Sequence, residues 1–307
     1  MDYASLIKEM GRGARGARDL NREQAEALFG EMLDGKVPDM ELGAMLIALR
    51  VKGESADEVA GFLAAMQVRT AKLTAPDGPR TVLLPSFNGA RKQANLMPLV
   101  ALLLAREGVP VLIFGRHDFD SRHSPFELLG ALGLHASPSL ADAETRLAGD
   151  KLAVLPLQML NPGLNSLMAL RPRLGVRNSS HSLAKLLDPF PVGRGVRVVA
   201  VTHPEYLDSM AAALPGLTVD GGRAMLMRAS EGEAYAHLRR KAHLIGFQNG
   251  DTAPLHPADT ADLDWLLSPA CAPAENAALI KAMLEGRETV PPRILEQVAA
   301  LRFLATN

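Results

Sequence analysis

The chain has 307 residues, of which 48% are hydrophobic and 22% charged, and its formal net charge is −1. This composition excludes a disordered chain, and the neutral charge balance argues against a uniformly basic nucleic-acid binder. The single cysteine, Cys271, excludes a disulfide framework and a cysteine-rich zinc site. Residues 1–22 lack the apolar core of a signal peptide, and the longest apolar run, 96–105, is too short to span a bilayer. We therefore expect a cytoplasmic protein without a membrane segment.

The first third of the chain carries the pattern of three short helices. Asn21 and Gln24 form a capping box that predicts a helix to about Leu33. A second helix is expected from Pro38 to the turn at Gly53, and a third begins at Ser55, where Glu58 completes another capping box. Short turns between short helices predict a small helical unit.

After the turn-rich segment 76–79, apolar β-prone runs alternate with helical patterns. The strands are expected at Thr81–Leu84, Val111–Phe114, Leu152–Leu155, Val196–Val201 and Arg223–Met227. The helices are expected at Leu96–Arg106, Pro125–Leu132, Glu205–Leu214, Ala258–Leu267, Ala274–Glu285 and Pro292–Leu304. Such alternation predicts a mostly parallel sheet with helices on its faces.

These patterns predict a two-domain protein of the α+β or α/β class. The first domain is a small helical domain over 1–75, completed by helices within 162–188, where helical pattern continues without a strand partner. The second is a larger α/β domain over 80–307 with a mostly parallel central sheet.

The charges are unevenly spread along the chain. Residues 171–197 hold six basic residues and one acidic residue, whereas residues 248–307 hold four basic and eight acidic. Such asymmetry can produce a basic face on a neutral protein, although single arginines more often solvate an exposed surface. Four basic residues of the segment 171–197 could contact phosphates: Arg171, Arg173, Arg177 and Lys185. The cluster Arg239, Arg240 and Lys241 could do so as well.

Three strings resemble the anthranilate phosphoribosyltransferase family and the related pyrimidine nucleoside phosphorylases. They are LNREQAEALFGEMLDGKVPDMELGAMLIALRVKGESADEVAGFLAAM at 20–66, LRPRLGVRNSSHSLAKLL at 170–187 and VTHPEY at 201–206. The resemblance covers nearly the whole chain. It implies a helical domain, an α/β domain and a cleft between them, together with a homodimer formed through the helical domains.

The motifs that hold phosphoribosyl pyrophosphate in that family are changed. In place of its Gly-Thr-Gly-Gly-Asp turn, residues 85–92 read PSFNGARK, which keep Gly89 with Asn88, Arg91 and Lys92 as candidate phosphate contacts. In place of its Lys-His-Gly-Asn-Arg motif, residues 114–118 read FGRHD, which leave Arg116.

The acidic pair that holds Mg²⁺ in the family is replaced by Ala234 and Tyr235. Glu231 and Glu233 are weak candidates to substitute, because carboxylates suit Mg²⁺ but these two are not adjacent. No cofactor is expected, except Mg²⁺ in the alternative that the chain is an active enzyme. Arg171 matches the family arginine that faces the aromatic acid substrate.

The string SFNGARKQANLMPLVALLLAREGVPVLI at 86–113 resembles the YbiB-type branch of the family. That resemblance implies nucleic-acid binding rather than anthranilate transfer. The leading hypothesis is a dimeric, sequence-independent nucleic-acid binder on a phosphoribosyltransferase fold. Two alternatives stay open: an active glycosyltransferase with an altered substrate, using Mg²⁺, and a protein-interaction scaffold.

Overall fold

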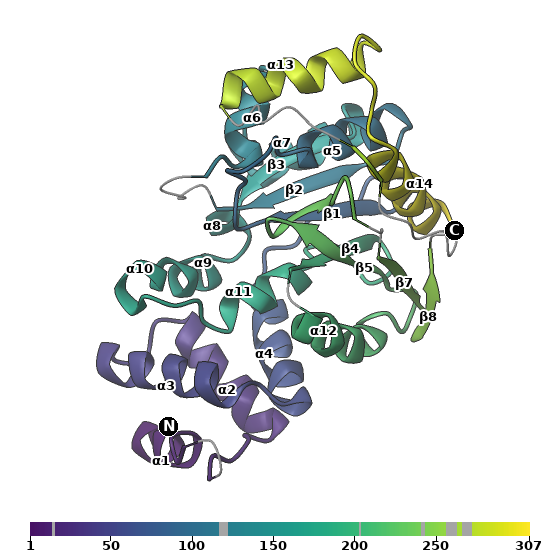
Figure 1. Ribbon diagram of the computed structural model, residues 1–307. Helices are drawn as coiled ribbons and strands as arrows, with labels where there is room; N and C mark the ends of the chain where they lie inside the picture. Colours follow the sequence, from purple (N-terminus) through teal and green to yellow (C-terminus); the bar gives the residue numbers. More distant parts are fainter. Residues whose placement is uncertain (14–15, 117–121, 203, 241–242, 256–262, 266–271) are drawn as a thin grey trace. The chain divides into compact units, whose positions relative to one another are not determined.

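The computed structural model describes residues 1–307 except 14–15, 117–121, 203, 241–242, 256–262 and 266–271. The chain forms two compact units, each built from two stretches of sequence. The first unit contains Met1–Ala71 and Leu157–Pro189, and the second contains Lys72–Pro156 and Phe190–Asn307 (Figure 1). No helix in the described part of the chain is long and apolar enough to cross a membrane.

The first unit is helical. Its helices are α1 (Tyr3–Met10), α2 (Arg22–Leu33), α3 (Asp39–Lys52), α4 (Ala56–Val68), α8 (Leu157–Leu160), α9 (Pro162–Ala169), α10 (Arg171–Leu174) and α11 (Ser180–Leu183), followed by the 3₁₀ turn η1 (Ala184–Leu186). Both predicted capping boxes are confirmed, at Asn21 with Gln24 and at Ser55 with Glu58. The apolar sides of α2 and α4 face each other, and Phe29 and Phe62 meet there with ring centroids 4.8 Å apart.

Glu58 ties α4 to the segment before α2. Its carboxylate is fully buried and accepts hydrogen bonds from Leu20 N at 3.0 Å, Ser55 N at 2.8 Å and Lys52 Nζ at 2.6 Å. Lys52 is itself 7% exposed at its side chain and also contacts Asp19. A buried charge with this many partners holds the turns between three helices in one arrangement.

The second unit is built on an eight-stranded sheet. Its strands are β1 (Thr81–Ser86), β2 (Val111–Gly115), β3 (Leu152–Pro156), β4 (Gly195–Val201), β5 (Arg223–Ser230), β6 (Glu233–Ala236), β7 (Leu244–Gln248) and β8 (Asp251–Pro254). The strand order is β3-β2-β1-β4-β5-β7-β8, and β6 pairs with β5. Strands β1 to β5 run parallel, whereas β6, β7 and β8 add antiparallel pairs.

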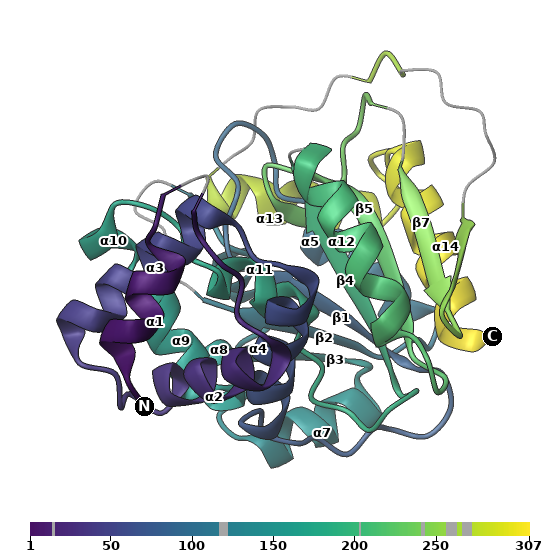
Figure 2. The ribbon, with the colours of Figure 1, turned by 90° about the horizontal axis from the view of Figure 1, so that it is seen from below.

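Helices cover both faces of this sheet. They are α5 (Met97–Arg106), α6 (Pro125–Ala131), α7 (Leu140–Gly149), α12 (Pro204–Leu217), α13 (Pro273–Leu284) and α14 (Pro292–Thr306). Helices α5, α13 and α14 contribute to one core with alternate residues of β1, β4 and β5. Figures 1 and 2 together show α12 on the opposite face of the sheet from α5. Burial on both faces explains why the parallel strands read as continuous apolar runs.

The predicted fold class is confirmed: a helical part and an α/β part with a mostly parallel sheet. The five predicted strands correspond to β1 to β5, and the antiparallel strands β6 to β8 were not predicted. Helices α1 and α7 were also missed. The predicted helix Ala258–Leu267 falls mostly outside the described residues, and it is wrong at Leu263–Trp265, which have no regular structure.

Candidate functional site

The site begins where β1 ends. The loop after Ser86 meets the tight hairpin between β5 and β6, although Gly89 and Glu233 are 144 residues apart in the sequence. Glu231 and Gly232 turn this hairpin with positive φ angles of 52° and 91°. Because the turn is short, it presents two carboxylates to one loop.

Glu233 is fully buried and accepts several hydrogen bonds from this loop. Its donors are Ser86 Oγ at 2.8 Å, Asn88 N at 3.0 Å, Gly89 N at 2.9 Å and Asn95 Nδ2 at 3.5 Å. Burial raises the pKa of the Glu233 carboxyl, and the hydrogen bonds from Ser86, Gly89 and Asn88 oppose that rise. The carboxylate thus occupies a position where backbone N–H groups converge on an anion.

Glu231 receives the next two backbone N–H groups of the loop. Its carboxylate oxygens lie 3.2 and 3.4 Å from Arg91 N, and Oε1 lies 3.0 Å from Lys92 N. Asn88 Nδ2 also donates to the carbonyl of Gly232 at 2.8 Å. A Cβ on Gly232 would lie 2.8 Å from Asn88 Cγ, so this close approach requires glycine.

Further side chains close the site. Arg122 Nη1 donates to the carbonyl of Gly89 at 3.1 Å, and Gln93 Nε2 donates to Tyr235 Oη at 3.1 Å. Burial raises the pKa of the Tyr235 hydroxyl, so this group stays protonated. Phe87 is 4% exposed and fills the start of the loop. The sequence gives no direct signal of these contacts, because each one joins segments that are distant along the chain.

The structure brings together four of the predicted site residues in this loop: Asn88, Gly89, Arg91 and Lys92. Asn88 is buried, Gly89 has a φ of 65°, and the side chains of Arg91 and Lys92 are exposed. Arg116 lies beside them, because its backbone N–H donates to the carbonyl of Ser86 at 3.1 Å.

Arg239 and Arg240 follow β6 in the same unit and are exposed. Their backbone N–H groups both donate to His237 Nδ1 at 3.2 Å, which orders this turn. The third member of the predicted cluster, Lys241, lies outside the described residues.

The other predicted basic residues lie in the helical unit. Arg171 and Arg173 are exposed on α10, and Arg173 Nη2 pairs with Asp39 Oδ2 at 3.0 Å. Arg177 and Lys185 are half-buried, and each makes an interaction of its own.

Glu231 and Glu233, the weak Mg²⁺ candidates, both accept hydrogen bonds from the loop's backbone. In the part of the chain that the structure describes, no group of three or more His, Cys, Asp or Glu side chains could hold a metal ion.

Comparison with known proteins shows the family to which this chain belongs. Residues 4–69 match the helical bundle domain of the glycosyl transferase family. An anthranilate phosphoribosyltransferase of Methylocella silvestris is 30% identical over 95% of this chain and 84% of its own length. The chain belongs to the anthranilate phosphoribosyltransferase family.

Within the anthranilate phosphoribosyltransferase family, the chain is more similar to the uncharacterized protein YbiB of Escherichia coli, with 43% identity over 97% of this chain and 93% of that protein. The crystal structure of anthranilate phosphoribosyltransferase from Thermus thermophilus is 25% identical, with a TM-score of 0.74 over 100% of this chain and 89% of that one. The yeast enzyme in complex with PRPP and Mg shares the fold at 17% identity, with a TM-score of 0.69 over 99% and 86%.

Proposed function

We propose that this chain uses the phosphoribosyltransferase fold without transferring phosphoribosyl groups, and that it binds nucleic acid through the phosphates without reading sequence. One observation carries the first part: the backbone N–H groups of Asn88, Gly89, Arg91 and Lys92 already hold the carboxylates of Glu233 and Glu231. From the resemblance to the family, we expect the pyrophosphate turn at this loop, which supports the proposal.

A pyrophosphate and a carboxylate compete for the same donors, since both are anions that accept from N–H groups. Glu233 is fully buried and joined to Ser86 as well as to the loop. Its displacement would leave a buried carboxyl group and its donors without partners, which is costly. A pyrophosphate arriving with Glu231 and Glu233 in place would find these backbone N–H donors already occupied. This arrangement supports a binding role rather than phosphoribosyl transfer.

The exposed cations of the α/β unit support nucleic acid as the ligand. Glu231 accepts from the backbone N–H groups of Arg91 and Lys92, and their side chains are exposed. Among the described residues, neither side chain pairs with a carboxylate. Arg239 and Arg240 are exposed as well. Phosphate contacts of this kind are independent of base sequence. The remaining proposed contacts are Arg116, Arg171, Arg173, Arg177, Lys185 and Lys241.

The test is a titration of the full chain against fluorescent single-stranded and double-stranded oligonucleotides across a salt series. Each phosphate contact contributes a slope of about −0.9 for duplex or about −0.7 for single strands in log K against log salt. We expect binding that weakens steeply with salt. In the double variant R91A/K92A, we expect the magnitude of the slope to fall by the amount that roughly two phosphate contacts contribute. Fluorescence anisotropy measures both.

Arg287→Ala is the matched control, because Arg287 is exposed in the same unit but pairs with Glu285. It should leave the slope unchanged. A slope near zero for the wild type would remove the nucleic-acid proposal. Turnover of phosphoribosyl pyrophosphate with Mg²⁺ and anthranilate, lost in Glu231→Gln, would instead support the alternative of an active transferase.

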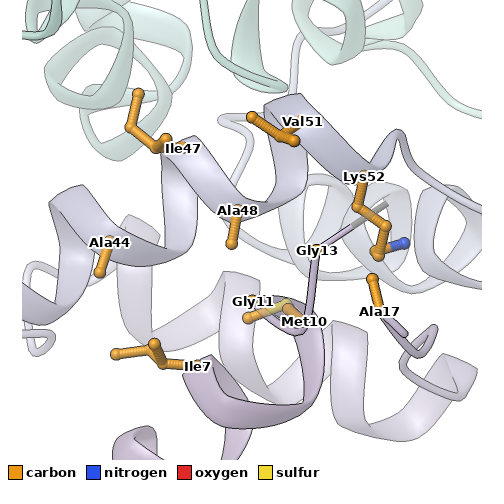
Figure 3. Close-up of a pocket in the computed structure, with 10 residues that line it drawn as sticks. All are labelled: Ile7, Met10, Gly11, Gly13, Ala17, Ala44, Ile47, Ala48, Val51 and Lys52. Carbon is orange, nitrogen blue, oxygen red and sulfur yellow. The ribbon is translucent and has the colours of Figure 1, made fainter. Parts of the chain in front are cut away.

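The same proposal includes a homodimer through the helical unit. Helix α3 exposes Met40, Ile47 and Val51 on one side, at 79%, 39% and 70% exposure. Ile47 and Val51 also line a cavity of about 270 Å³ between α1 and α3 (Figure 3). The other lining residues are mostly apolar or small: Ile7, Met10, Gly11, Gly13, Ala17, Ala44, Ala48 and the stem of Lys52. An exposed apolar surface of this kind is typical of a protein interface.

We expect the double variant I47D/V51D to convert a dimer into a monomer, because two carboxylates would be buried at the interface without partners. Sedimentation equilibrium measures the mass. Val192→Asp is the control, since Val192 is 75% exposed but belongs to the other unit. A monomeric wild type, or a variant that stays dimeric, would contradict this interface.

A further inference from the structure

Three arginines lie at the amino ends of neighbouring parallel strands. Arg80 precedes β1 and Arg194 precedes β4, and the register Thr81↔Gly195 sets these two side by side. Arg223 begins β5 beside Val196, one pleat further along. Since side chains alternate along a strand, the three residues fall on the same face of the sheet. They lie at the opposite end of β1 from the loop that Glu231 and Glu233 contact.

No carboxylate in the described part of the chain pairs with any of these three guanidinium groups. Arg80 Nε donates to the carbonyl of Gly193 at 2.9 Å. Arg194 donates to the carbonyls of Gly78 and Pro76. Among the described residues these arginines form no ion pair, and every acceptor they use is neutral.

Arg223 is the most enclosed of the three. It is 7% exposed, and its Nη1 donates to the carbonyls of Gly221 at 3.1 Å and Gly222 at 3.0 Å and to Asn249 Oδ1 at 3.4 Å. Its Nε is buried and has no hydrogen-bond partner in the described structure. A buried charged group with an unused donor is costly unless something else supplies the acceptor.

The three charges also act on one another. The pKa of Arg80 is lowered, first by burial and then by the positive charges of Arg223 and Arg194. Asp77 and Asp220 occupy the same turns, yet both are exposed and pair with none of the three. The fold therefore gathers like charges without the counter-charge that would offset their repulsion.

We infer that Arg80, Arg194 and Arg223 form a binding site for a phosphate group. The carbonyl contacts fix each guanidinium. Among the described residues, no partner is present for its other donors, which are the Nη groups of Arg80, Nε of Arg194, and Nε and Nη2 of Arg223. Planar guanidinium groups bind phosphate oxygens through paired N–H donors. The phosphate can be free or part of a phosphodiester, and the site does not depend on the proposed nucleic-acid binding.

The experiment titrates inorganic phosphate into the full chain by calorimetry, with chloride at matched ionic strength as the reference. We expect phosphate-specific binding that weakens at least tenfold in Arg80→Gln and in Arg194→Gln. Arg194→Lys keeps the positive charge but loses the paired N–H donors of the guanidinium, so it should weaken phosphate binding as well. Arg287→Gln, an exposed arginine of the same unit, should not. Circular dichroism checks that each variant is folded.

A second arm repeats the titration with an oligonucleotide. One outcome is that the wild type binds the oligonucleotide but not free phosphate, and that Arg80→Gln and Arg194→Gln lose the oligonucleotide binding. This outcome would identify a phosphodiester as the ligand. Phosphate binding that depends on these arginines, with no oligonucleotide binding, would support the site while the proposed nucleic-acid function fails. Binding of both ligands unchanged by the variants, or no binding of either, would overturn the site.

Discussion

Replacement of Glu233 by alanine is expected to lower the free energy of unfolding by roughly 4 kcal/mol, because it removes a buried carboxylate that several donors share. Ser86, Asn88 and Gly89 would each lose an acceptor in an interior without water. Urea unfolding followed by circular dichroism measures the loss.

Glu231→Ala is the matched control for this experiment. Glu231 is half-buried and accepts from the backbone of the same loop, so its removal should cost only about 1 kcal/mol. Equal losses for Glu231→Ala and Glu233→Ala would contradict the picture of Glu233 as the anchor of the loop.

The contribution of Glu233 also has a pH dependence. Burial raises the folded-state pKa of Glu233, so its stabilising contribution is complete below the pKa of an unfolded glutamate. That contribution declines as the pH rises through the folded-state pKa. The difference between the wild type and Glu233→Ala should therefore be larger in acid than in neutral solution.

Gly61→Ala is expected to destabilise the helical unit by about 3 kcal/mol through overpacking. A Cβ on Gly61 of α4 would lie 2.7 Å from Glu26 N and 2.8 Å from Ala25 Cβ, both on α2. The two helices could accommodate it only by moving apart, with loss of the contact between their apolar sides. Thermal and urea unfolding of the purified variant measure the effect.

Gly43→Ala tests the same chemical change where there is room. Gly43 lies within α3, and no atom lies within 4 Å of the position of its Cβ. Alanine favours the helix over glycine by about 1 kcal/mol, so this variant should be more stable than the wild type. If Gly43→Ala lost stability, or if Gly61→Ala lost none, the close contact between α2 and α4 would not be what determines the effect of a glycine-to-alanine change on stability.

Much of the fold could be predicted from local sequence. The capping boxes at Asn21 and Ser55 mark where α2 and α4 begin, and the apolar runs of β1 to β5 mark strands buried on both faces. Helix α7 was missed although Ser139 caps it and Ala143 and Leu147 recur at helical spacing. Strands β6 and β8, of four residues each, are too short for their periodicity to distinguish them from turns.

The candidate site was predictable only in part. The changed glycine-rich turn is visible in the sequence, and so are the two glutamates of the β5–β6 hairpin. Their contact is not, because it depends on how β5 and β6 pair and on where β1 ends. The sequence left Glu231 and Glu233 as weak candidates for Mg²⁺ ligands, and in the structure both accept hydrogen bonds from backbone N–H groups.

The contact between the hairpin and the loop has an evolutionary consequence. A mutation that removes Glu233 alone leaves Ser86, Asn88 and Gly89 without their acceptor, while Phe87 still fills the start of the loop. A side-chain substitution in the loop leaves the backbone N–H groups of Asn88 and Gly89 in place, so Glu233 keeps these two donors. Removal of Glu233 is therefore the costly single step, because it leaves a buried set of donors without an acceptor. Under the function proposed above, a return to pyrophosphate binding would require the loss of Glu233 together with changes in the loop that it holds.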